Sequence, residues 1–167
     1  MKTLILVRHA KSSWDEAGLS DSERPLNERG KKDAPEMAGR LRKRGLTIDK
    51  IVSSPAERAF RTARYFAREF EIKKEAIAVE KTLYGAMPSQ FLQVVASLKD
   101  KYSTVLFFSH NPGITDFANT LTNVRTDNIP TCGVFAVQAN VDSWKDFAKA
   151  EKSFLFYDYP KNPLGMI

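Results

Sequence analysis

The stretch Thr3-Leu4-Ile5-Leu6-Val7-Arg8-His9 decides how the chain is expected to fold. Five apolar or β-branched residues, 3–7, run without a break and stop at a cation and an imidazole. A short continuous apolar run of this kind is typical of a strand buried on both faces, in a parallel sheet covered by helices. Open α/β sheets bind their ligands at the carboxyl ends of strands. We therefore expect Arg8 and His9 to lie at the mouth of a crevice.

A second apolar run, Thr104 to Ser109, ends in the same way at His110. The chain has 2 histidines, and each follows a predicted buried strand. If the two strands are parallel, both imidazoles arrive at one edge of the sheet. A single histidine at a strand end usually makes only an ordinary hydrogen bond, but a convergent pair is a common acid–base or nucleophile arrangement. We favour the second interpretation for His9 and His110.

Strand and helix signals alternate along most of the chain, which predicts an α/β fold: a three-layer α/β/α sandwich with a mostly parallel sheet. The first helix begins at Asn27 as N-cap, or at Asp33 with Glu36 completing a capping box, and ends at Gly45. Further strands are expected at 50–53 and 76–79, and further helices at 54–70, 89–98 and 111–121. Ser54 is expected to cap the helix over 54–70, with Pro55 in its first turn.

The end of the chain changes character, because two apolar runs at 134–137 and 154–157 are joined by a polar segment, 141–150, without a helix. This pattern predicts an antiparallel pair at the C-terminal edge of the sheet. The polar segment 11–24 is expected to form a loop after the first strand, with Trp14 packed beneath it. No repeat or linker divides the sequence, so we predict one domain over residues 1–167.

Composition narrows the classes of function. The formal net charge of +6 favours anionic partners, but on charge alone nucleic acid, acidic lipid and phosphorylated substrates all remain open. The basic cluster 40–44 has no interleaved aromatic residues that could stack bases, so we expect no nucleic-acid partner. No apolar run is long enough to span a bilayer, and no signal-peptide pattern precedes the first strand, so we expect a cytoplasmic protein without a membrane partner. The single cysteine, Cys132, is expected to be structural.

Two histidines and at least one arginine at a strand-end crevice indicate phosphate chemistry. Arginine binds phosphate oxygens bidentately and keeps its charge, and a neutral imidazole attacks phosphorus directly. The sequence contains no H-x-x-x-H pair and no clustered D-x-D, and two histidines are few for a dedicated metal site. It also lacks the P-loop and G-x-S-x-G motifs. We therefore expect neither a metal nor a cofactor.

Four segments in order resemble the histidine phosphatase superfamily, the phosphoglycerate mutase-like proteins. They are Leu6-Val7-Arg8-His9-Ala10, Arg24-Pro25-Leu26-Asn27-Glu28-Arg29-Gly30, Ser53-Ser54-Pro55-Ala56-Glu57-Arg58-Ala59-Phe60-Arg61-Thr62-Ala63 and Ser109-His110-Asn111. These correspond to the family's R-H-G, R-P-L-x-x-x-G, S-S-P-x-x-R-A-x-x-T-A and late S-H motifs. The short chain and the segment from Arg8 to Trp14 resemble the small SixA-type phosphohistidine phosphatases in particular. The matching region extends from residue 4 to about residue 122.

The resemblance implies a role for each site residue. His9 would be the nucleophile that becomes phosphohistidine, Arg8 and Arg58 would bind the phosphoryl oxygens, and His110 would stabilise the transferring group. Spacing alone does not distinguish Arg58 from the other arginines of its helix. Glu80 lies near the family's general-acid position, although an exposed strand-end carboxylate is an equally good interpretation. The family glycine is Ala10 here, and Asp15 stands where larger members have asparagine.

The expected function is cofactor-independent phosphatase activity through a covalent phosphohistidine, with a phosphohistidine protein as the implied substrate. The short segments between the motifs leave little sequence for a lid, which favours an open site. Two alternatives stay open: a small-molecule phosphomonoesterase of the same superfamily, and a non-catalytic module that binds phosphate or polyanions. The sequence does not indicate the oligomeric state.

Overall fold

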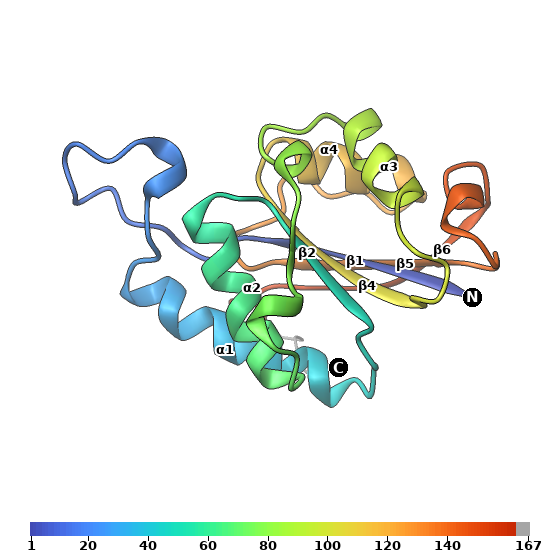
Figure 1. The fold of residues 1–167 in the computed structure, drawn as a ribbon, viewed down its shortest axis with the longest axis horizontal. Helices are drawn as coiled ribbons and strands as arrows, with labels where there is room; N and C mark the ends of the chain where they lie inside the picture. The colour runs from blue at the N-terminus through green and yellow to red at the C-terminus, as the bar shows by residue number, and fades with distance from the viewer. Residues whose placement is uncertain (163–167) are drawn as a thin grey trace.

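A six-stranded sheet with the order β3-β2-β4-β1-β5-β6 is the middle layer of the computed structural model, which describes residues 1–162 (Figure 1). The strands are β1 (Lys2–Arg8), β2 (Lys50–Ser53), β3 (Ala78–Val79), β4 (Thr104–Ser109), β5 (Val134–Ala139) and β6 (Lys152–Asp158). The first four strands are parallel to one another, whereas β5 is antiparallel to β1 and β6 is antiparallel to β5. The predicted α/β fold with an antiparallel C-terminal edge is therefore confirmed.

The register of the two central strands brings the histidines together. β1 and β4 are neighbours, and Arg8 at the end of β1 is paired with Ser109 at the end of β4. The ladder extends one step further, because the amide of His9 donates to the carbonyl of Ser109 at 3.1 Å. His9 and His110 therefore leave the sheet side by side, as expected of parallel strands that end at one edge.

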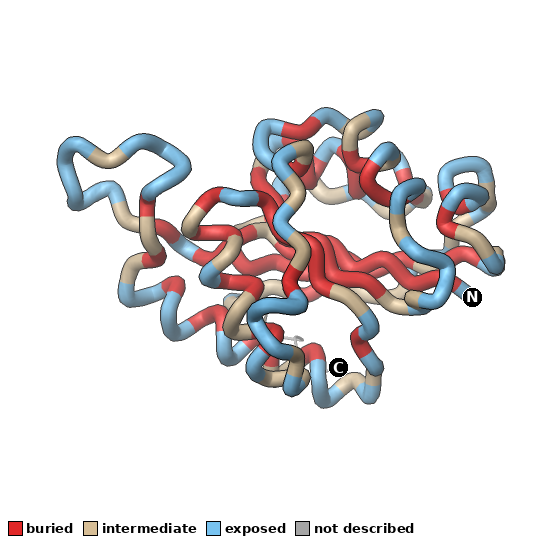
Figure 2. Tube along the Cα trace, in the orientation of Figure 1, coloured by how far each residue is buried: buried red, intermediate tan, exposed pale blue. Residues whose placement is uncertain are grey.

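Helices cover both faces of the sheet. α1 (Glu28–Lys43) and α2 (Glu57–Glu69) pack on one face, and α3 (Pro88–Ala96) and α4 (Gly113–Leu121) on the other (Figure 1). Side chains of β1 alternate between two buried clusters, with Leu4 and Leu6 on the α3–α4 side and Ile5 and Val7 on the α1–α2 side. Both faces of the central strands are therefore buried, as the tube in Figure 2 shows, which explains their unbroken apolar sequence.

Local signals account for the ends of the first helix. Of the two N-caps that the sequence allowed, Asn27 is the one used, since its side chain accepts from the amide of Gly30 at 2.9 Å. Asp33 instead lies inside α1, where it is buried. The chain leaves the helix at Gly45, whose φ of +80° is a conformation that glycine adopts without strain.

Two local predictions are corrected. Helix α2 begins at Glu57 with Ala56 as N-cap, because the chain is still extended at Ala56, with a φ of −60° and a ψ of 138°. The segment 141–150 is more than a polar turn, since it contains the short 3₁₀ helix η4 (Trp144–Asp146). Trp144 and Phe147 are both buried there, and the indole donates to the carbonyl of Tyr102 at 2.8 Å. The two aromatic rings close the end of the α3–α4 core.

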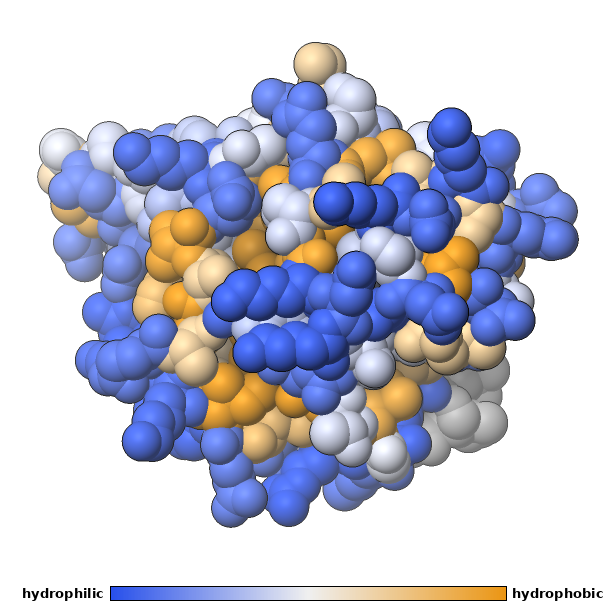
Figure 3. Space-filling model, turned by 45° about the vertical axis from the view of Figure 1, so that its right-hand side comes forward, coloured by the Kyte–Doolittle hydropathy of each residue, from blue (hydrophilic) through white to orange (hydrophobic). Residues whose placement is uncertain are grey.

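On the face shown in Figure 3, hydrophilic side chains lie over and between separate apolar patches. No helix within residues 1–162 combines the length and the apolar character needed to cross a bilayer.

Candidate active site

The predicted site residues His9, His110, Arg8 and Arg58 line one pocket at the carboxyl ends of β1 and β4. The pocket has a volume of about 250 Å³. Its other described lining residues are Lys11, Ser12, Trp14, Arg24, Asn111 and Thr131. Arg58 enters from the first turn of α2, so the strand ends and a helix start jointly form the pocket. The lining is strongly cationic, and this favours an anionic ligand.

A larger hollow of about 420 Å³ lies on another side of the loop 11–25. Its lining mixes Asp15, Glu16 and Glu28 with Lys31 and Arg61 and contains no histidine. The residues that the sequence predicts to carry out the chemistry therefore line the smaller pocket.

The ring of His9 is held in one tautomer. Its Nδ1 lies 2.7 Å from the carbonyl oxygen of Ala10, and a carbonyl oxygen only accepts, so Nδ1 carries the proton. Burial lowers the pKa of His9 to about 3 against the opposing effect of the hydrogen bond to Ala10, and His110, Arg58 and Arg8 lower it further. The ring is therefore neutral at pH 7, and the lone pair of Nε2 is available to attack. Arg58 Nε donates a long hydrogen bond of 3.4 Å to this Nε2 atom, and a phosphoryl group that binds Nε2 would replace it.

His110 is tethered to the segment that leads into α2. Its Nε2 lies 2.7 Å from the hydroxyl oxygen of Ser54, and the centroid of its ring is 5.1 Å from that of His9. Burial, followed by the charge of Arg58, lowers its pKa to about 4. Nδ1 of His110 has no hydrogen-bond partner among the described residues. A neutral His110 therefore retains hydrogen-bonding capacity beyond its contact with Ser54.

Two guanidinium groups converge on the pocket. Arg8 donates through Nη1 to the carbonyl of Ile129 at 2.9 Å, and its buried Nε has no partner among residues 1–162. Burial and the nearby charge of Arg58 lower the pKa of Arg8. Arg58 is only 6% exposed and forms an ion pair with Asp21. Arg8 is partly buried, and it is close enough to the buried Arg58 for the two cations to repel each other. A phosphoryl group bound beside both would relieve that repulsion.

Hydrogen bonds to the backbone fix the pocket floor, which consists of His9, His110 and Arg58. The hydroxyl of Thr62 accepts from the amide of Ala10 at 2.9 Å and donates to the carbonyl of Arg58 at 2.7 Å, so it links β1 to α2. The amide of Cys132 donates to the carbonyls of Arg8 and His9, each at 3.0 Å. The Cys132 thiol is buried, and its burial raises its pKa, which agrees with a structural cysteine.

The structure does not bring Glu80 to this pocket. Its carboxylate accepts from the amide of Thr82 at 3.3 Å, as the N-cap of the 3₁₀ helix η3 (Lys81–Leu83). It lines a separate hollow with Lys50 and Tyr102. The backbone of Glu80 does continue the sheet edge, since its amide bonds to the Ser53 carbonyl, but capping turns the side chain away.

No carboxylate is present among the described residues that line the His9 pocket. Asp15, at the family's asparagine position, is exposed and lines the larger hollow instead. Within residues 1–162, no group of three or more histidine, cysteine, aspartate or glutamate residues could hold a metal ion.

Sequence reasoning missed three contributors to this region. Ser54 was interpreted as a helix cap, but its hydroxyl also contacts His110. Asp21 and Tyr84 carried no motif that separates them from other polar residues, yet Asp21 contacts Arg58 and Tyr84 packs edge-on against His110 with ring centroids 5.3 Å apart. The expectation for Trp14 was wrong: it is 76% exposed, and the Arg24 guanidinium lies over its ring, 3.1 Å from the centroid. Stacking on a cation takes the place of burial there.

Comparison with known proteins agrees with this geometry. Residues 4–84 match the model of the histidine phosphatase superfamily, branch 1. An uncharacterized chloroplastic protein of Arabidopsis thaliana is 31% identical over 153 residues, which cover 87% of this chain and 70% of the relative. The chain belongs to the histidine phosphatase superfamily. It is therefore a phosphatase, a hydrolase that acts on phosphoryl groups. Phosphoserine phosphatase 1 of Hydrogenobacter thermophilus is 41% identical over 86 residues, covering 48% of this phosphatase and 39% of that protein.

Solved structures show the same fold. A SixA-type protein from Agrobacterium tumefaciens superposes with a TM-score of 0.79 at 23% identity, covering 95% of this phosphatase and 98% of that chain. The protein histidine phosphatase SixA in complex with tungstate also has a TM-score of 0.79, at 21% identity, with 95% and 97% of the two chains covered. The phosphatase therefore has the SixA-like form of the phosphoglycerate mutase-like fold.

Proposed function

We propose that this phosphatase transfers the phosphoryl group of its substrate to Nε2 of His9 and then to water. The observation that carries the proposal is the state of His9, a buried neutral imidazole whose Nδ1 proton is committed to Ala10 and whose Nε2 lies beside Arg58. A nucleophile needs an unprotonated lone pair, and burial, with a smaller effect of the neighbouring cations, keeps Nε2 of His9 unprotonated.

The proposed reaction has two steps. Arg8 and Arg58 bind the phosphoryl oxygens, Nε2 of His9 forms a bond to phosphorus, and the bond from phosphorus to the leaving group breaks. His110 donates a hydrogen bond to the oxygens as their charge develops. Water then forms a bond to phosphorus, the bond from phosphorus to Nε2 breaks, and inorganic phosphate leaves with the remaining water proton passing to solvent.

A phosphohistidine protein is the substrate class that the pocket favours. An alkoxide leaving group needs a proton from a nearby acid, but the described lining of the pocket contains no carboxylate. A phosphohistidine takes up a proton from water on the ring nitrogen that carries no phosphorus. When the bond from phosphorus to the other nitrogen breaks, the ring departs as a neutral imidazole and needs no enzyme acid. The shared fold with the tungstate-bound protein histidine phosphatase SixA supports the same substrate class.

Turnover in the presence of EDTA tests the proposal, with a phosphohistidine protein and an aryl phosphate as substrates. Wild type is expected to turn over without added metal and to form an acid-labile phosphoenzyme after brief incubation with labelled substrate. His9→Ala is expected to lose the phosphoenzyme and at least a thousandfold in kcat/KM. Glu80→Gln is the matched control, and both of its rates are expected to stay within about twofold of wild type.

The two rates also separate the alternatives. Faster turnover of small phosphoesters than of phosphohistidine would indicate a phosphomonoesterase, for which the local similarity to phosphoserine phosphatase 1 is the supporting observation. Polyanion binding without any phosphoenzyme would instead indicate a non-catalytic binding module and would contradict the proposed mechanism.

The single domain over 1–167 and the cytoplasmic location stay predictions.

A further inference from the structure

The guanidinium group of Arg58 has two donor edges, and they face different partners. Nη1 donates to the backbone carbonyl of Asp21 at 2.6 Å, and Nη2 donates to Oδ2 of the same residue at 2.9 Å. Asp21 therefore occupies the end-on edge formed by the two terminal nitrogens. The side-on edge begins at Nε, which faces Nε2 of His9 at 3.4 Å. A guanidinium presents its donors in a rigid fork, so holding one edge fixes the direction of the other.

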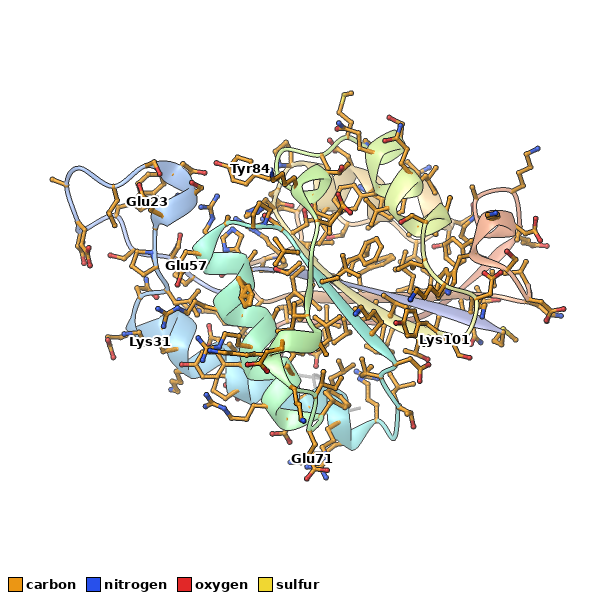
Figure 4. All side chains as sticks on the ribbon, in the orientation of Figure 1. Glu23, Lys31, Glu57, Glu71, Tyr84 and Lys101 are labelled. Atoms are coloured by element: carbon orange, nitrogen blue, oxygen red, sulfur yellow. The ribbon has the colours of Figure 1, made fainter. Side chains whose placement is uncertain are left out.

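Asp21 is itself held by three side chains, those of Arg24 in the same loop and of the distant Arg58 and Tyr84. It lies in the 3₁₀ helix η1 (Asp21–Glu23) of the loop 11–25. Its Oδ1 accepts from Arg24 Nη1 at 2.9 Å, and its Oδ2 accepts from the hydroxyl of Tyr84 as well as from Arg58. In Figure 4, Tyr84 extends toward the loop that carries Glu23, where Asp21 also lies.

The chemistry of these contacts excludes Asp21 as a proton donor. The hydrogen bond from Tyr84, together with those from Arg58 and Arg24, holds the pKa of the Asp21 carboxyl well below its usual range. The same hydrogen bond raises the pKa of Tyr84. Both groups therefore keep one protonation state at neutral pH, and Asp21 acts as a fixed anion.

We propose that Asp21 is a positioning residue of the phosphatase reaction, which holds the end-on edge of Arg58 so that its side-on edge is directed at the phosphoryl group on His9. This inference rests on the proposed function. A phosphoryl group bonded to Nε2 of His9 meets the Nε edge of Arg58 and leaves the contacts with Asp21 in place. Asp21 thus contributes to the site through Arg58, and its own carboxylate does not touch the substrate.

The competing interpretation is that Asp21 occupies Arg58 in place of the phosphoryl group. The two interpretations predict opposite changes in oxyanion binding when Asp21 is replaced. If Asp21 positions Arg58, its loss weakens oxyanion binding and slows turnover. If Asp21 competes for Arg58, its loss removes a negative charge from the pocket and strengthens oxyanion binding. The separation of the two edges favours the positioning role.

Asp21→Asn tests the inference, with Asp15→Asn as the matched control, since Asp15 is an exposed carboxylate of the same loop that lies outside the pocket. Asp21→Asn is expected to lower kcat/KM about ten- to hundredfold, because small misplacement of a binding group has effects of that size. Asp15→Asn is expected to stay within about twofold of wild type. In an Arg58→Ala background, Asp21→Asn is expected to cause no further loss, since its effect passes through Arg58.

Binding of inorganic phosphate, measured by calorimetry, makes the test independent of turnover. It is expected to weaken in Asp21→Asn, and the Nε–H signal of Arg58 in a nitrogen-15 spectrum is expected to broaden as its order is lost. Unchanged or tighter phosphate binding, or an equal additional loss in the Arg58→Ala background, would overturn the inference. Absence of turnover in wild type would contradict the proposed function alone, because phosphate binding would still decide the role of Asp21.

Discussion

The pocket floor and the loop 11–25 meet at the same cavity of about 250 Å³ but are built in different ways. The floor consists of His9, His110 and Arg58, all at most 8% exposed, on strand ends and a helix start. The loop contributes Trp14, which is 76% exposed, and Asp21, whose side chain is 47% exposed. Backbone hydrogen bonds and buried hydroxyls hold the floor, whereas charged and aromatic side chains hold the loop.

The two regions differ in how far burial controls the protonation of their side chains. Groups whose protonation state must be fixed lie where burial dominates, as the lowered pKa values of His9 and His110 show. Trp14 and Asp21, in contrast, lie in a segment whose two ends are joined by an isolated bridge between Ser12 and Leu26. Gly30 fits closely against the chain next to this bridge, because a Cβ at Gly30 would lie 2.2 Å from the carbonyl oxygen of Lys11.

The acid response of the protein gives the largest expected effect, and it concerns the floor. The pKa values of His9 and His110 are lower in the folded state than in the unfolded state, so the unfolded chain binds more protons below pH 6.5. The free energy of unfolding is expected to fall as the pH is lowered from 6.5 toward 4.5, by at most about 1.4 kcal/mol per pH unit for each histidine. Urea unfolding across this range measures the fall.

NMR measures the pKa values of these two side chains directly, because the chain contains no other histidine. Neither ring signal is expected to titrate between pH 7.5 and 5 in the folded protein, and both are expected to titrate near 6.5 in urea. A folded-state midpoint near 6.5 for either ring would remove the contrast between floor and loop.

Thr62→Val tests how strongly the floor depends on its buried hydroxyl. The substitution keeps the side-chain shape but leaves the buried amide of Ala10 without its hydroxyl partner, and the carbonyl of Arg58 retains only its helical hydrogen bond. A loss of about 1–3 kcal/mol in the free energy of unfolding is expected, from the cost of burying unpaired polar groups. Turnover is expected to fall at least about tenfold as His9 and Arg58 lose their link. Thr62→Ser retains the hydroxyl and is expected to keep most of the activity, so an equal loss in both variants would exclude the hydrogen bond as the cause.

The smallest effect is expected at Trp14, on the loop. Trp14→Ala removes the ring on which Arg24 stacks, a contact worth about 0.5–1 kcal/mol at an exposed site. The free energy of unfolding is expected to change by less than about 1 kcal/mol, and kcat/KM by less than about fivefold. Trp14→Phe retains a ring and serves as the control. A larger loss on a phosphohistidine protein than on an aryl phosphate would show that the loop also contacts the rest of the substrate.

The floor could be predicted from the sequence because its signals are local and strong. Each histidine follows an unbroken apolar run, and parallel pairing of two buried strands necessarily brings their ends together. Arg58 needed the family motif, because Arg61, Arg64 and Arg68 lie on the same helix and spacing does not distinguish them. Glu80 was proposed from its place near the family's general-acid position, but whether a strand-end side chain faces a pocket or caps the next turn is decided by backbone angles that the sequence pattern does not reveal.

The contacts of the loop could not be predicted in this way. Asp21 meets Arg58 across 37 positions of the chain, and Tyr84 meets Asp21 across 63. Such long-range polar pairs leave no periodicity in the sequence. The prediction that Trp14 packs beneath the loop was wrong because large aromatic residues are usually buried, and the stacking of Arg24 on the ring is visible only in three dimensions.

The continuous ladder between β1 and β4 has a consequence for partial unfolding. The spacing of the two imidazoles is set by main-chain pairing in the middle of the sheet, and amides in such positions exchange with solvent only when the whole molecule opens. The loop can detach in a smaller opening that leaves the ladder intact. A molecule in that state would still present His9 and His110 side by side, with Arg58 no longer held by Asp21. Mild denaturant should therefore reduce catalytic efficiency before it separates the histidines, and the loss should be fully reversible.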